Sequence, residues 1–329
     1  MESGDSAFVT GGSGFIGGRL VGRLTREGIT VKALARSDDS AAKVEALGAE
    51  PVRGDLDDED AMRAGAEGCR YAFHAAAKVE DWGDPADFER LNVEGTKRVL
   101  RAAKAGGVER FVHVGTEAAL FAGEPLVNAD ERAPLRPDSK SLYPATKAQA
   151  ELAVRDASAD GFATTVVRPR FVWGPGDTTV LPSIVDMVKA GKFAFIGGGR
   201  QRTSTTHVDN TVEGLILAAD KGTPGAAYFV TDGEPIVFRE WITKLLATRG
   251  VEAPGKSVPK PVAGALAAGG ETLWKLLRRT EKPPPLTRMA YWVSAIECTL
   301  DDSAARRELG YVPVITREQG LADLSEEPS

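Results

Sequence analysis

Tyr143 and Lys147 stand four positions apart in the segment SLYPATKAQAE, which covers residues 141–151. Side chains at this spacing share one face of a helix, and Pro144 suits the first helical turn because a backbone N–H is not needed there. An ammonium group beside a phenol favours the phenolate, so Lys147 is expected to lower the pKa of Tyr143 from its ordinary value of about 10. Such a phenol can deliver a proton to a ketone oxygen, or remove one from an alcohol, while a hydride is transferred.

Thr116 supplies the third group that this chemistry needs. It follows the apolar run RFVHV at residues 110–114, and a hydroxyl at the end of a strand can hold the oxygen of a substrate. A Tyr-x-x-x-Lys pair alone is weak evidence, because both residue types are common on helix surfaces. Parallel strands end at one edge of their sheet, however, and there Thr116, Tyr143 and Lys147 can converge from distant parts of the chain. We therefore predict these three as catalytic residues.

A glycine-rich turn in AFVTGGSGFIGGRL, residues 7–20, lies between a predicted strand and a predicted helix. It contains Gly-x-Gly-x-x-Gly from Gly12 onward and Gly-x-x-Gly-x-x-Gly from Gly11 onward. Glycines let the backbone turn tightly and approach a pyrophosphate, and the start of the helix offers free amides and a partial positive charge. The alternative, a plain turn, is weakened by the strand and the helix on either side. The predicted dinucleotide contacts of this turn are Gly11, Ser13, Gly14, Phe15, Ile16 and Gly17.

Arg36, at the end of the second predicted strand, decides the expected cofactor. NAD-binding folds usually place a carboxylate near this position, whereas TVKALAR, residues 30–36, ends in a guanidinium that can pair with the 2′-phosphate of NADP. NADP is therefore favoured over NAD, although Arg36 could be an ordinary surface arginine and Asp38 and Asp39 lie close by. Asp55 closes the third strand, where it can accept a hydrogen bond from the adenine amino group. After the fourth strand, small side chains leave room for a cofactor at Ala75, Ala76 and Ala77.

These residues need a sheet whose strand ends meet at one edge. Short apolar runs alternate with amphipathic helical segments in the first half of the chain, which is typical of a parallel sheet. We expect an α/β fold, a doubly wound parallel Rossmann sheet with a smaller, mostly C-terminal substrate lobe. Past Val166 the alternation is interrupted by Pro and Gly, so the expected dinucleotide-binding domain covers residues 1–170, with 207–230 returning to it. Residues 171–206 and 231–329 are left for the substrate-binding lobe.

The bulk composition is that of an ordinary globular protein. With 329 residues the chain exceeds the length at which a single core usually splits into lobes. The formal charge is −6 and neither sign forms a long run, so nucleic-acid binding is not expected. Cys69 and Cys298 have no neighbouring metal ligands, so neither a disulfide framework nor a metal site is expected. The sequence starts without a signal-peptide pattern and has no apolar run of membrane-spanning length, which predicts a soluble, cytoplasmic protein.

The order of these motifs resembles the extended short-chain dehydrogenase/reductase superfamily over nearly the whole chain. The matching segments include TGGSGFIGG, GDL, HAAA, LNVEGT, YPATKAQAE, RPRFVWGPGD and THVDN. Other segments, among them AAKVEDWGD, RFVHVGTEA and AYFVTDGEP, are similar to the branch of the 3-beta-hydroxysteroid dehydrogenases, sterol carboxylate dehydrogenases and bacterial reductases of 2-alkyl-3-oxoalkanoic acids. The resemblance implies an NADP(H)-dependent oxidoreductase that interconverts a ketone and a secondary alcohol on an apolar substrate, either sterol-like or a 2-alkyl-3-oxo acid.

The resemblance also implies roles for single residues. Within the predicted catalytic set, the tyrosine would be the acid or base, the lysine would bind the nicotinamide ribose, and the threonine would hold the substrate oxygen. Asn92 would support the site through its helix. The superfamily often has two serines before the catalytic hydroxyl, where this chain has Val114 and Gly115. The resemblance therefore does not define the hydrogen bonds around that hydroxyl. Beyond the glycine turn and Arg36, the implied cofactor contacts are Asp55, Leu56, Ala75, Ala76, Ala77, Asn92, Val114, Tyr143, Lys147, Pro169, Phe171 and Val172.

Trp82, Glu117 and His207 are the expected substrate contacts, whereas the other two histidines, inside apolar strands, are expected in the core. Dehydratases of the superfamily place two acids after the threonine, and Ala118 in the second position disfavours that reaction. The segment from Val262 to Leu277 predicts either a lid over an apolar pocket, which we favour, or a helix with weak membrane-surface contact. A homodimer is expected by analogy with the family.

Two other functions stay open from the sequence. A nucleotide-sugar epimerase with tightly bound NAD would return the hydride to the same substrate, and Arg200 and Arg202 could bind its diphosphate. A non-catalytic dinucleotide sensor would bind the cofactor without turnover.

Overall fold

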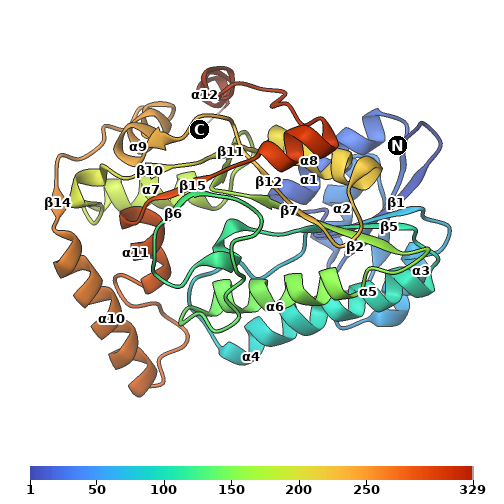
Figure 1. Ribbon diagram of the computed structural model, residues 1–329, viewed down its shortest axis with the longest axis horizontal. Helices are drawn as coiled ribbons and strands as arrows, with labels where there is room; N and C mark the ends of the chain where they lie inside the picture. The colour runs from blue at the N-terminus through green and yellow to red at the C-terminus, as the bar shows by residue number, and fades with distance from the viewer. Residues whose placement is uncertain (328–329) are drawn as a thin grey trace.

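A seven-stranded parallel sheet forms the centre of the computed structural model, which describes residues 1–327 (Figure 1). Its order is β12-β7-β5-β4-β1-β2-β3, so the sheet grows in opposite directions from the neighbouring strands β1 and β4. Ligands of such folds bind at this reversal, outside the carboxyl ends of the strands. The predicted doubly wound parallel sheet is confirmed. The strands are β1 (Ser6–Thr10), β2 (Thr30–Ala35), β3 (Glu50–Arg53), β4 (Tyr71–His74), β5 (Arg110–Val114), β7 (Ala163–Pro169) and β12 (Ala227–Val230).

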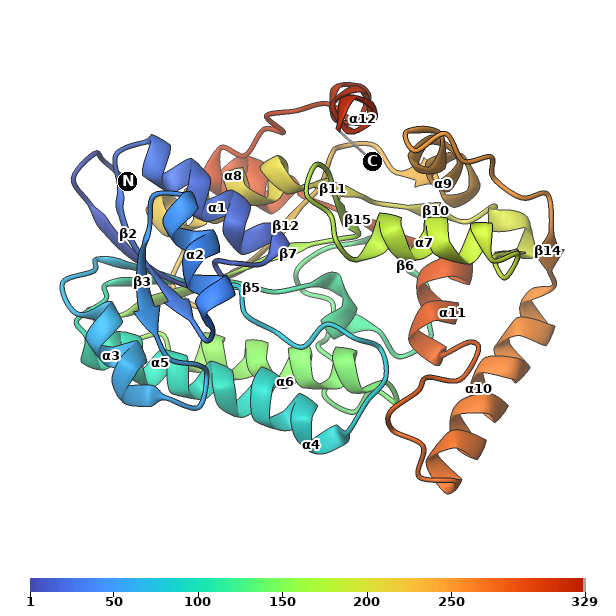
Figure 2. The same cartoon turned by 180° about the vertical axis from the view of Figure 1, so that it is seen from behind.

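Helices cover both faces of this sheet, as Figures 1 and 2 show. Neighbouring residues of a strand point to opposite faces, so Val9 packs in the core under one helical layer and Phe8 in the core under the other. Burial on both sides explains why the strands are continuous apolar runs rather than alternating ones. One layer holds α1 (Phe15–Arg26), α2 (Asp38–Ala46) and α8 (Val208–Lys221), and the other holds α3 (Glu59–Ala66), α5 (Gly95–Ala105) and α6 (Leu142–Asp156).

The helical stretch over residues 85–105 is irregular near its start. It runs through α4 (Pro85–Phe88), a π-helical segment η1 (Glu89–Glu94) and then α5. A π-turn accommodates an extra residue, which leaves the apolar periodicity nearly unchanged, and such segments are frequent at functional sites. Asn92 lies inside η1.

A second, four-stranded sheet joins parts of the chain that are far apart in sequence. Its order is β13-β10-β15-β6. Because β6 precedes α6 in the chain, residues before 170 also contribute to the lobe beyond the central sheet. The strands are β6 (Leu126–Ala129), β10 (Arg202–Thr203), β13 (Ile236–Val237) and β15 (Cys298–Leu300).

Two short parallel strand pairs and several helices complete this lobe. It has a hydrophobic core of its own around Trp173 and Trp241. The rings of these two residues pack edge to face with their centroids 4.7 Å apart. The pairs are β8 (Val172–Trp173) with β11 (Thr206–His207), and β9 (Phe195–Ile196) with β14 (Ser257–Val258). The longer helices are α7 (Val180–Lys189), α9 (Phe238–Ala247), α10 (Lys260–Leu276), α11 (Arg288–Ala295) and α12 (Arg317–Glu326). The short helical segments are η2 (Glu117–Leu120), η3 (Gly197–Gly199) and η4 (Ala305–Leu309).

Candidate active site

The glycine turn between β1 and α1 leaves no space for side chains. Gly11 has a φ of +75°, and a Cβ atom there would lie 2.6 Å from the backbone nitrogen of Ala76. A Cβ atom on Gly17 would overlap the carbonyl group of Gly11. A hydrogen bond of 3.0 Å from the Gly14 amide to the Gly11 carbonyl closes the turn. Since only glycine fits at Gly11 and Gly17, the backbone itself forms the surface that a ligand can approach.

The start of α1 suits a negatively charged group. No side chain caps this helix, and its first turn contains no acidic residue. Ser13 is exposed, while Phe15 and Ile16 are partly buried. The ring of Phe15 lies near the loop after β8, because a Cβ atom on Gly176 would be 3.9 Å from it. The free amides and the helix dipole together favour a phosphate group at this place.

Arg36 follows β2 directly, and its exposed side chain has no ion-pair partner in the described part of the chain. The two nearby carboxylates are engaged elsewhere: Asp38 pairs with Arg53 at 2.7 Å and Asp39 with Lys43 at 2.8 Å. Neither carboxylate neutralises Arg36, so its guanidinium remains available for an anion such as a ribose 2′-phosphate.

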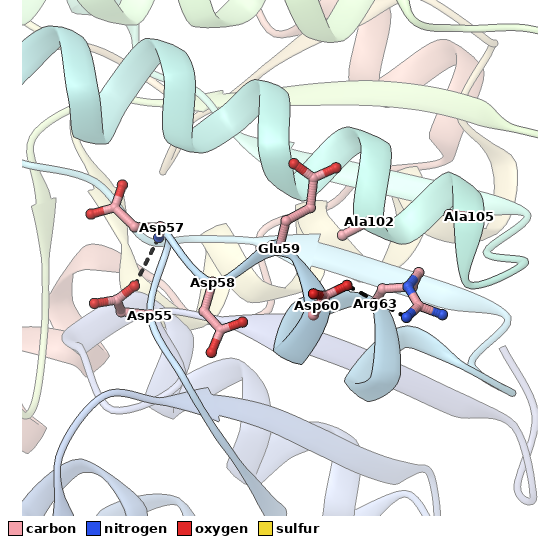
Figure 3. A pocket seen from close by; sticks show the side chains of 8 residues that line it. All are labelled: Asp55, Asp57, Asp58, Glu59, Asp60, Arg63, Ala102 and Ala105. Carbon is pink, nitrogen blue, oxygen red and sulfur yellow. Dashed lines mark hydrogen bonds and ion pairs between the residues drawn. The ribbon is translucent and has the colours of Figure 1, made fainter.

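Asp55 is exposed after β3, and its carboxylate accepts a hydrogen bond of 2.8 Å from the Asp57 amide. It borders a surface hollow of about 620 Å³ beside α3 and α5 (Figure 3). Acidic side chains dominate the lining of this hollow, with Arg63 as its cation. The negative charge of these side chains repels phosphate groups, so we do not expect the dinucleotide to bind in this hollow. Leu56, the neighbouring predicted contact, is buried.

The small residues after β4 border the glycine turn. Ala75, Ala76 and Ala77 are partly exposed, which leaves the carboxyl end of β4 open. His74, just before them, is buried, with its ring nitrogens 2.6 Å from the Thr10 hydroxyl and 2.9 Å from that of Thr96. His74 is therefore a satisfied core residue, as the sequence predicts.

Thr116, Tyr143 and Lys147 come together at the carboxyl end of β5. The Thr116 hydroxyl, at the start of η2, accepts a hydrogen bond of 3.1 Å from the Ala118 amide and shares one with the Tyr143 phenol. Lys147 follows one turn after Tyr143 in α6, and its ammonium donates to the Val114 carbonyl at 2.8 Å. The three residues predicted as catalytic are therefore neighbours in space.

The electrostatic environment of Tyr143 differs from the sequence-based expectation. Burial, and then the negative charge of Glu117, raise the pKa of the phenol, and the hydrogen bond with Thr116 acts in the lowering direction. Burial lowers the pKa of Lys147 to about 8, while Glu151 acts in the raising direction. The protein groups alone thus keep the phenol protonated, because the burial of an acid disfavours its charged form.

His113 is a partner of Lys147 that the sequence analysis assigned to the core alone. Its Nε2 atom lies 3.0 Å from the lysine Nζ, and its ring is buried. An ammonium group can only donate, so His113 accepts through Nε2 and carries its proton on Nδ1. Burial and the charge of Lys147 hold the pKa of His113 well below its ordinary value. The alternation along β5 could have indicated this contact, since His113 shares a face of the strand with Phe111, which packs in the core under α6.

Glu117 forms a buried ion pair beside the predicted catalytic residues. One carboxylate oxygen accepts from the Thr116 hydroxyl at 2.9 Å, and the other accepts from the Arg170 guanidinium at 2.5 Å. Arg170 also donates to the Thr203 hydroxyl at 2.9 Å, which fixes the pair from β10. Glu117 therefore reaches the site through Thr116. Sequence reasoning missed Arg170, although a second arginine in RPR between apolar residues is an unusual feature.

Asn92 ties three elements together. Its amide group donates to the Lys78 carbonyl at 3.0 Å and to the Thr146 hydroxyl at 3.1 Å, and its oxygen accepts from the Lys78 amide at 2.7 Å. These contacts link η1 to the loop after β4 and to α6, which carries Tyr143. The side chain is occupied by protein groups, which agrees with a supporting role.

The segment after β7 brings Phe171 and Val172 past the end of the central sheet. Pro169 ends β7, and Phe171 has a φ of +46°, which is uncommon for a residue with a side chain. Its ring packs edge to face on Phe238 at 6.3 Å, and Val172 pairs with Thr206 between β8 and β11. A strained backbone of this kind persists only where the surrounding structure holds it in place. Such residues are found most often at active sites and ligand sites.

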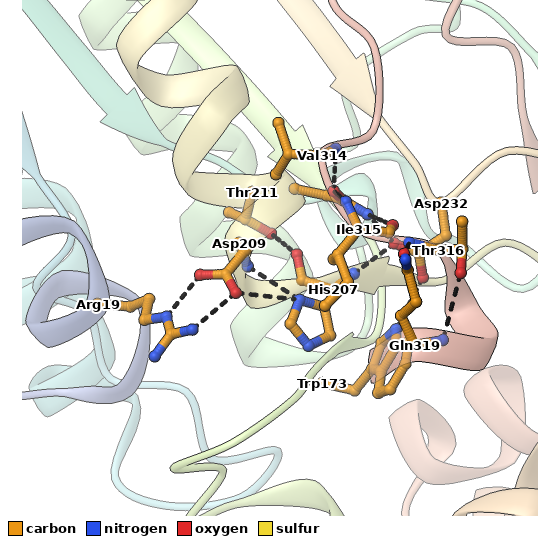
Figure 4. A network of polar contacts seen from close by, with 11 residues as sticks. Arg19, Trp173, His207, Asp209, Thr211, Asp232, Val314, Ile315, Thr316 and Gln319 are labelled. Carbon is orange, nitrogen blue, oxygen red and sulfur yellow. Dashed lines mark hydrogen bonds and ion pairs between the residues drawn. The ribbon is translucent and has the colours of Figure 1, made fainter. Parts of the chain in front are cut away.

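Trp82 and His207, two of the predicted substrate contacts, lie in different surroundings. The partly exposed Trp82 donates its indole N–H to the Arg279 carbonyl at 3.0 Å. His207 is fully buried, and its Nδ1 accepts from the Asp209 amide at 3.2 Å at the start of α8 (Figure 4). His207 thereby caps α8, and Asp209 pairs with Arg19. His207 therefore has no exposed surface for a substrate.

The fold and these groups define a dinucleotide-dependent oxidoreductase of the extended short-chain dehydrogenase/reductase superfamily. A model of the 3-beta hydroxysteroid dehydrogenase/isomerase family matches residues 8–260. The chain belongs to this family and is an NAD(P)-dependent dehydrogenase or reductase, which confirms the predicted superfamily, branch and enzyme class.

Two relatives and a solved structure are similar to nearly the whole chain. The 4-hydroxy-2-methyl-3-oxo-4-farnesyl-3,4-dihydroquinoline-1-oxide ketoreductase of Stigmatella aurantiaca is 46% identical over 95% of this chain and 94% of its own. The 2-alkyl-3-oxoalkanoate reductase of Stenotrophomonas maltophilia (strain K279a) is 36% identical over 96% of this chain and 97% of its own. The crystal structure of gox2253 has a TM-score of 0.80 at 28% identity, covering 97% of this chain and 96% of that one.

Proposed function

We propose that the protein interconverts a ketone and a secondary alcohol on a bulky apolar substrate, with NADP(H) as the cofactor. The observation that carries the proposal is the convergence of Thr116, Tyr143 and Lys147 at the sheet edge that also holds the glycine turn. Relatives named for a farnesyl-bearing quinoline ketone and for 2-alkyl-3-oxoalkanoates support a keto group with an apolar neighbourhood. A 2-alkyl-3-oxo acid or a sterol-like ketone is the substrate class to try first.

In the reductive direction, the Tyr143 phenol donates its proton to the substrate oxygen as negative charge develops there. The ammonium group of Lys147 stabilises the phenolate that is left behind. Thr116 holds the phenol in place and, by turning its hydroxyl from Glu117, can donate a second hydrogen bond to the substrate oxygen. When bound, the nicotinamide supplies the hydride in reduction and accepts it in oxidation.

The preference for NADP rests on Arg36. The crowding at Gly11 and Gly17 leaves a backbone cradle for a pyrophosphate, and the exposed guanidinium of Arg36 at the end of β2 suits a 2′-phosphate. Arg36→Asp should weaken NADPH binding about tenfold or more, because a charge-assisted contact is replaced by a repulsion, and should leave NADH binding equal or tighter. Fluorescence titration of both cofactors measures this, and an unchanged ratio of the two affinities would refute the preference.

We propose that the chain is divided into a cofactor-binding lobe and a substrate-binding lobe. Residues 1–170, with 207–230, would bind the dinucleotide, and residues 171–206 and 231–329 would bind the substrate. Residues 328 and 329 lie outside the described residues.

A panel of sterols, 2-alkyl-3-oxo acids and nucleotide sugars, followed by the absorbance of reduced nicotinamide, tests the reaction. Turnover of an apolar ketone or alcohol is expected, and Tyr143→Phe should lower its rate by about 10²-fold to 10⁴-fold, the usual contribution of a positioned acid or base. Conversion of a nucleotide sugar without net redox change, on cofactor retained through purification, would instead indicate an epimerase. Cofactor binding without turnover of any panel member would favour a sensor.

A further inference from the structure

The outward face of α10 is apolar along its whole length. The exposed fractions are 49% for Val262, 61% for Leu266, 48% for Leu273 and 79% for Leu276, followed by 52% for Leu277. These positions recur at helical spacing and form one stripe. The opposite face, with Ala263, Ala267 and Glu271, is buried. Figures 1 and 2 both show α10 at the outer end of the molecule, with α11 between it and the central sheet.

A cluster of cations continues this stripe. Lys275, Arg278, Arg279 and Lys282 are all exposed, and none of them has an ion-pair partner within residues 1–327. Glu281 is the acidic residue among them, and the nearest acid on α10, Glu271, is buried in an ion pair of 2.5 Å with Arg288. In a chain with a formal charge of −6, this end is locally positive.

We propose that α10 and residues 277–282 dock the protein on the surface of an anionic lipid bilayer. The apolar stripe would lie among the acyl chains near the headgroups and the cations would contact lipid phosphates, as in interfacial amphipathic helices. None of the described helices is long and apolar enough to cross a bilayer, so the contact is one of surface binding.

Two other occupants fit the observations less well. A second copy of α10 on the stripe would bring the two cation clusters into one interface with hardly any exposed carboxylate to balance them. A lid over the protein's own pocket, which the sequence analysis favours, would need the stripe to face inward. The segment after α10 is instead tied down: the Arg279 carbonyl accepts from Trp82, and Thr287 donates to Asp81 at 2.5 Å.

Binding to vesicles tests the proposal without any need for catalysis, so its outcome is independent of the proposed function. The full chain should sediment with vesicles that contain phosphatidylglycerol and only weakly with phosphatidylcholine vesicles. Leu266→Asp with Leu276→Asp should abolish sedimentation. Lys275→Gln with Arg278→Gln should weaken it about thirtyfold, the effect of two cations near an anionic surface, and should reduce its sensitivity to salt.

Matched controls separate docking through α10 from nonspecific binding to vesicles. Val127 and Val312 are each 64% exposed and lie outside α10, so Val127→Asp with Val312→Asp should bind vesicles like the wild type. Thermal unfolding and NADPH binding show whether each variant is folded. The proposal is overturned if the wild type ignores both kinds of vesicle or if the control variant loses binding equally. It is also overturned if the α10 variant instead converts a dimer to a monomer in light scattering, because a second copy then covers the stripe.

Discussion

Glu117 places a negative charge beside the phenol on which the proposed reaction depends. The carboxylate is buried and held between the Thr116 hydroxyl and the Arg170 guanidinium. Its charge raises the pKa of Tyr143, and it therefore favours the protonated phenol that ketone reduction uses. Under the proposed mechanism, Glu117 would act as a positioning residue that favours the protonated phenol.

Replacing Glu117 with Gln should move the pH dependence of alcohol oxidation to lower pH. Oxidation needs the phenolate, and without the carboxylate, with Arg170 and Lys147 still positive, the phenolate forms at lower pH. The pH profile of kcat/KM for the alcohol measures the shift. Glu117→Asp keeps the charge and should keep the profile. Glu271→Gln removes a different buried carboxylate and should leave the profile in place, whereas a profile unmoved in Glu117→Gln would show that this charge does not act on the phenol.

Two buried histidines should make the fold sensitive to mild acid. Burial, with the charge of Lys147, lowers the pKa of His74 to about 3, and His113 is held well below its ordinary value. Below a pH of about 6.5 the unfolded chain binds protons that the folded chain does not, so stability falls as the pH falls, by about 1.4 kcal/mol per pH unit for each histidine. That contribution is complete above pH 6.5 and is lost towards the folded pKa.

The midpoint of urea unfolding at pH 7.5 and at pH 5.5 measures this effect. His74→Gln removes one of the titrating groups, so its loss of stability between the two pH values should be smaller than that of the wild type, whatever its absolute stability. Equal losses in both proteins would mean that His74 is not the proton acceptor of the unfolded state.

Spacing and order along the chain were enough to predict that Thr116, Tyr143 and Lys147 lie close together, because α6 fixes Tyr143 relative to Lys147 and the end of β5 fixes Thr116. The ion pair of Glu117 with Arg170 could not be predicted in this way. It joins two segments whose approach depends on how β7 and β10 pack, and no local pattern carries that information. The sequence predicts a lowered pKa for Tyr143, whereas the structure raises it. The reason is the same, since burial and Glu117 both act through tertiary contacts.

Among the elements, the glycine turn tolerates substitution least. Gly11→Ala should lower both stability and NADPH affinity, because its Cβ atom would lie 2.6 Å from the backbone of Ala76 at a φ of +75°. Gly161 has the same φ of +75° with open space around it, so Gly161→Ala carries only the conformational cost of about 1–2 kcal/mol. Urea unfolding and NADPH titration of both variants isolate the crowding. Equal effects would show that the turn can widen without harm.

The strands β2 and β5 were predicted within a residue, because burial on both faces produces uninterrupted apolar runs between turn residues. The segment from Glu89 to Glu94 was not predicted as π-helical, since a single extra residue hardly changes the apolar period. Aspartate is a common helix cap, but Asp209 forms an ion pair with Arg19 and His207 caps α8 instead.

At the scale of the molecule, the side chains of Asp81 and Trp82 connect the loop after β4 to the segment between α10 and α11. Trp82→Phe removes the hydrogen bond to Arg279, so the free energy of unfolding in urea should fall by about 1 kcal/mol. The affinity for NADPH, measured by titration, should stay unchanged, because the glycine turn and Arg36 lie apart from this contact. A parallel loss of cofactor affinity would place Trp82 in the dinucleotide site instead.

The four-stranded sheet has a consequence for biosynthesis. Its strand β15 (Cys298–Leu300) lies between β10 and β6, so neither of those strands has its full set of neighbours until almost the entire chain has been translated. The central sheet can close while the ribosome is still at work, whereas Leu126–Ala129 must wait with unpaired backbone groups. Loss of the residues from Cys298 onward would therefore leave two open strand edges, and aggregation of the shortened chain is the expected result.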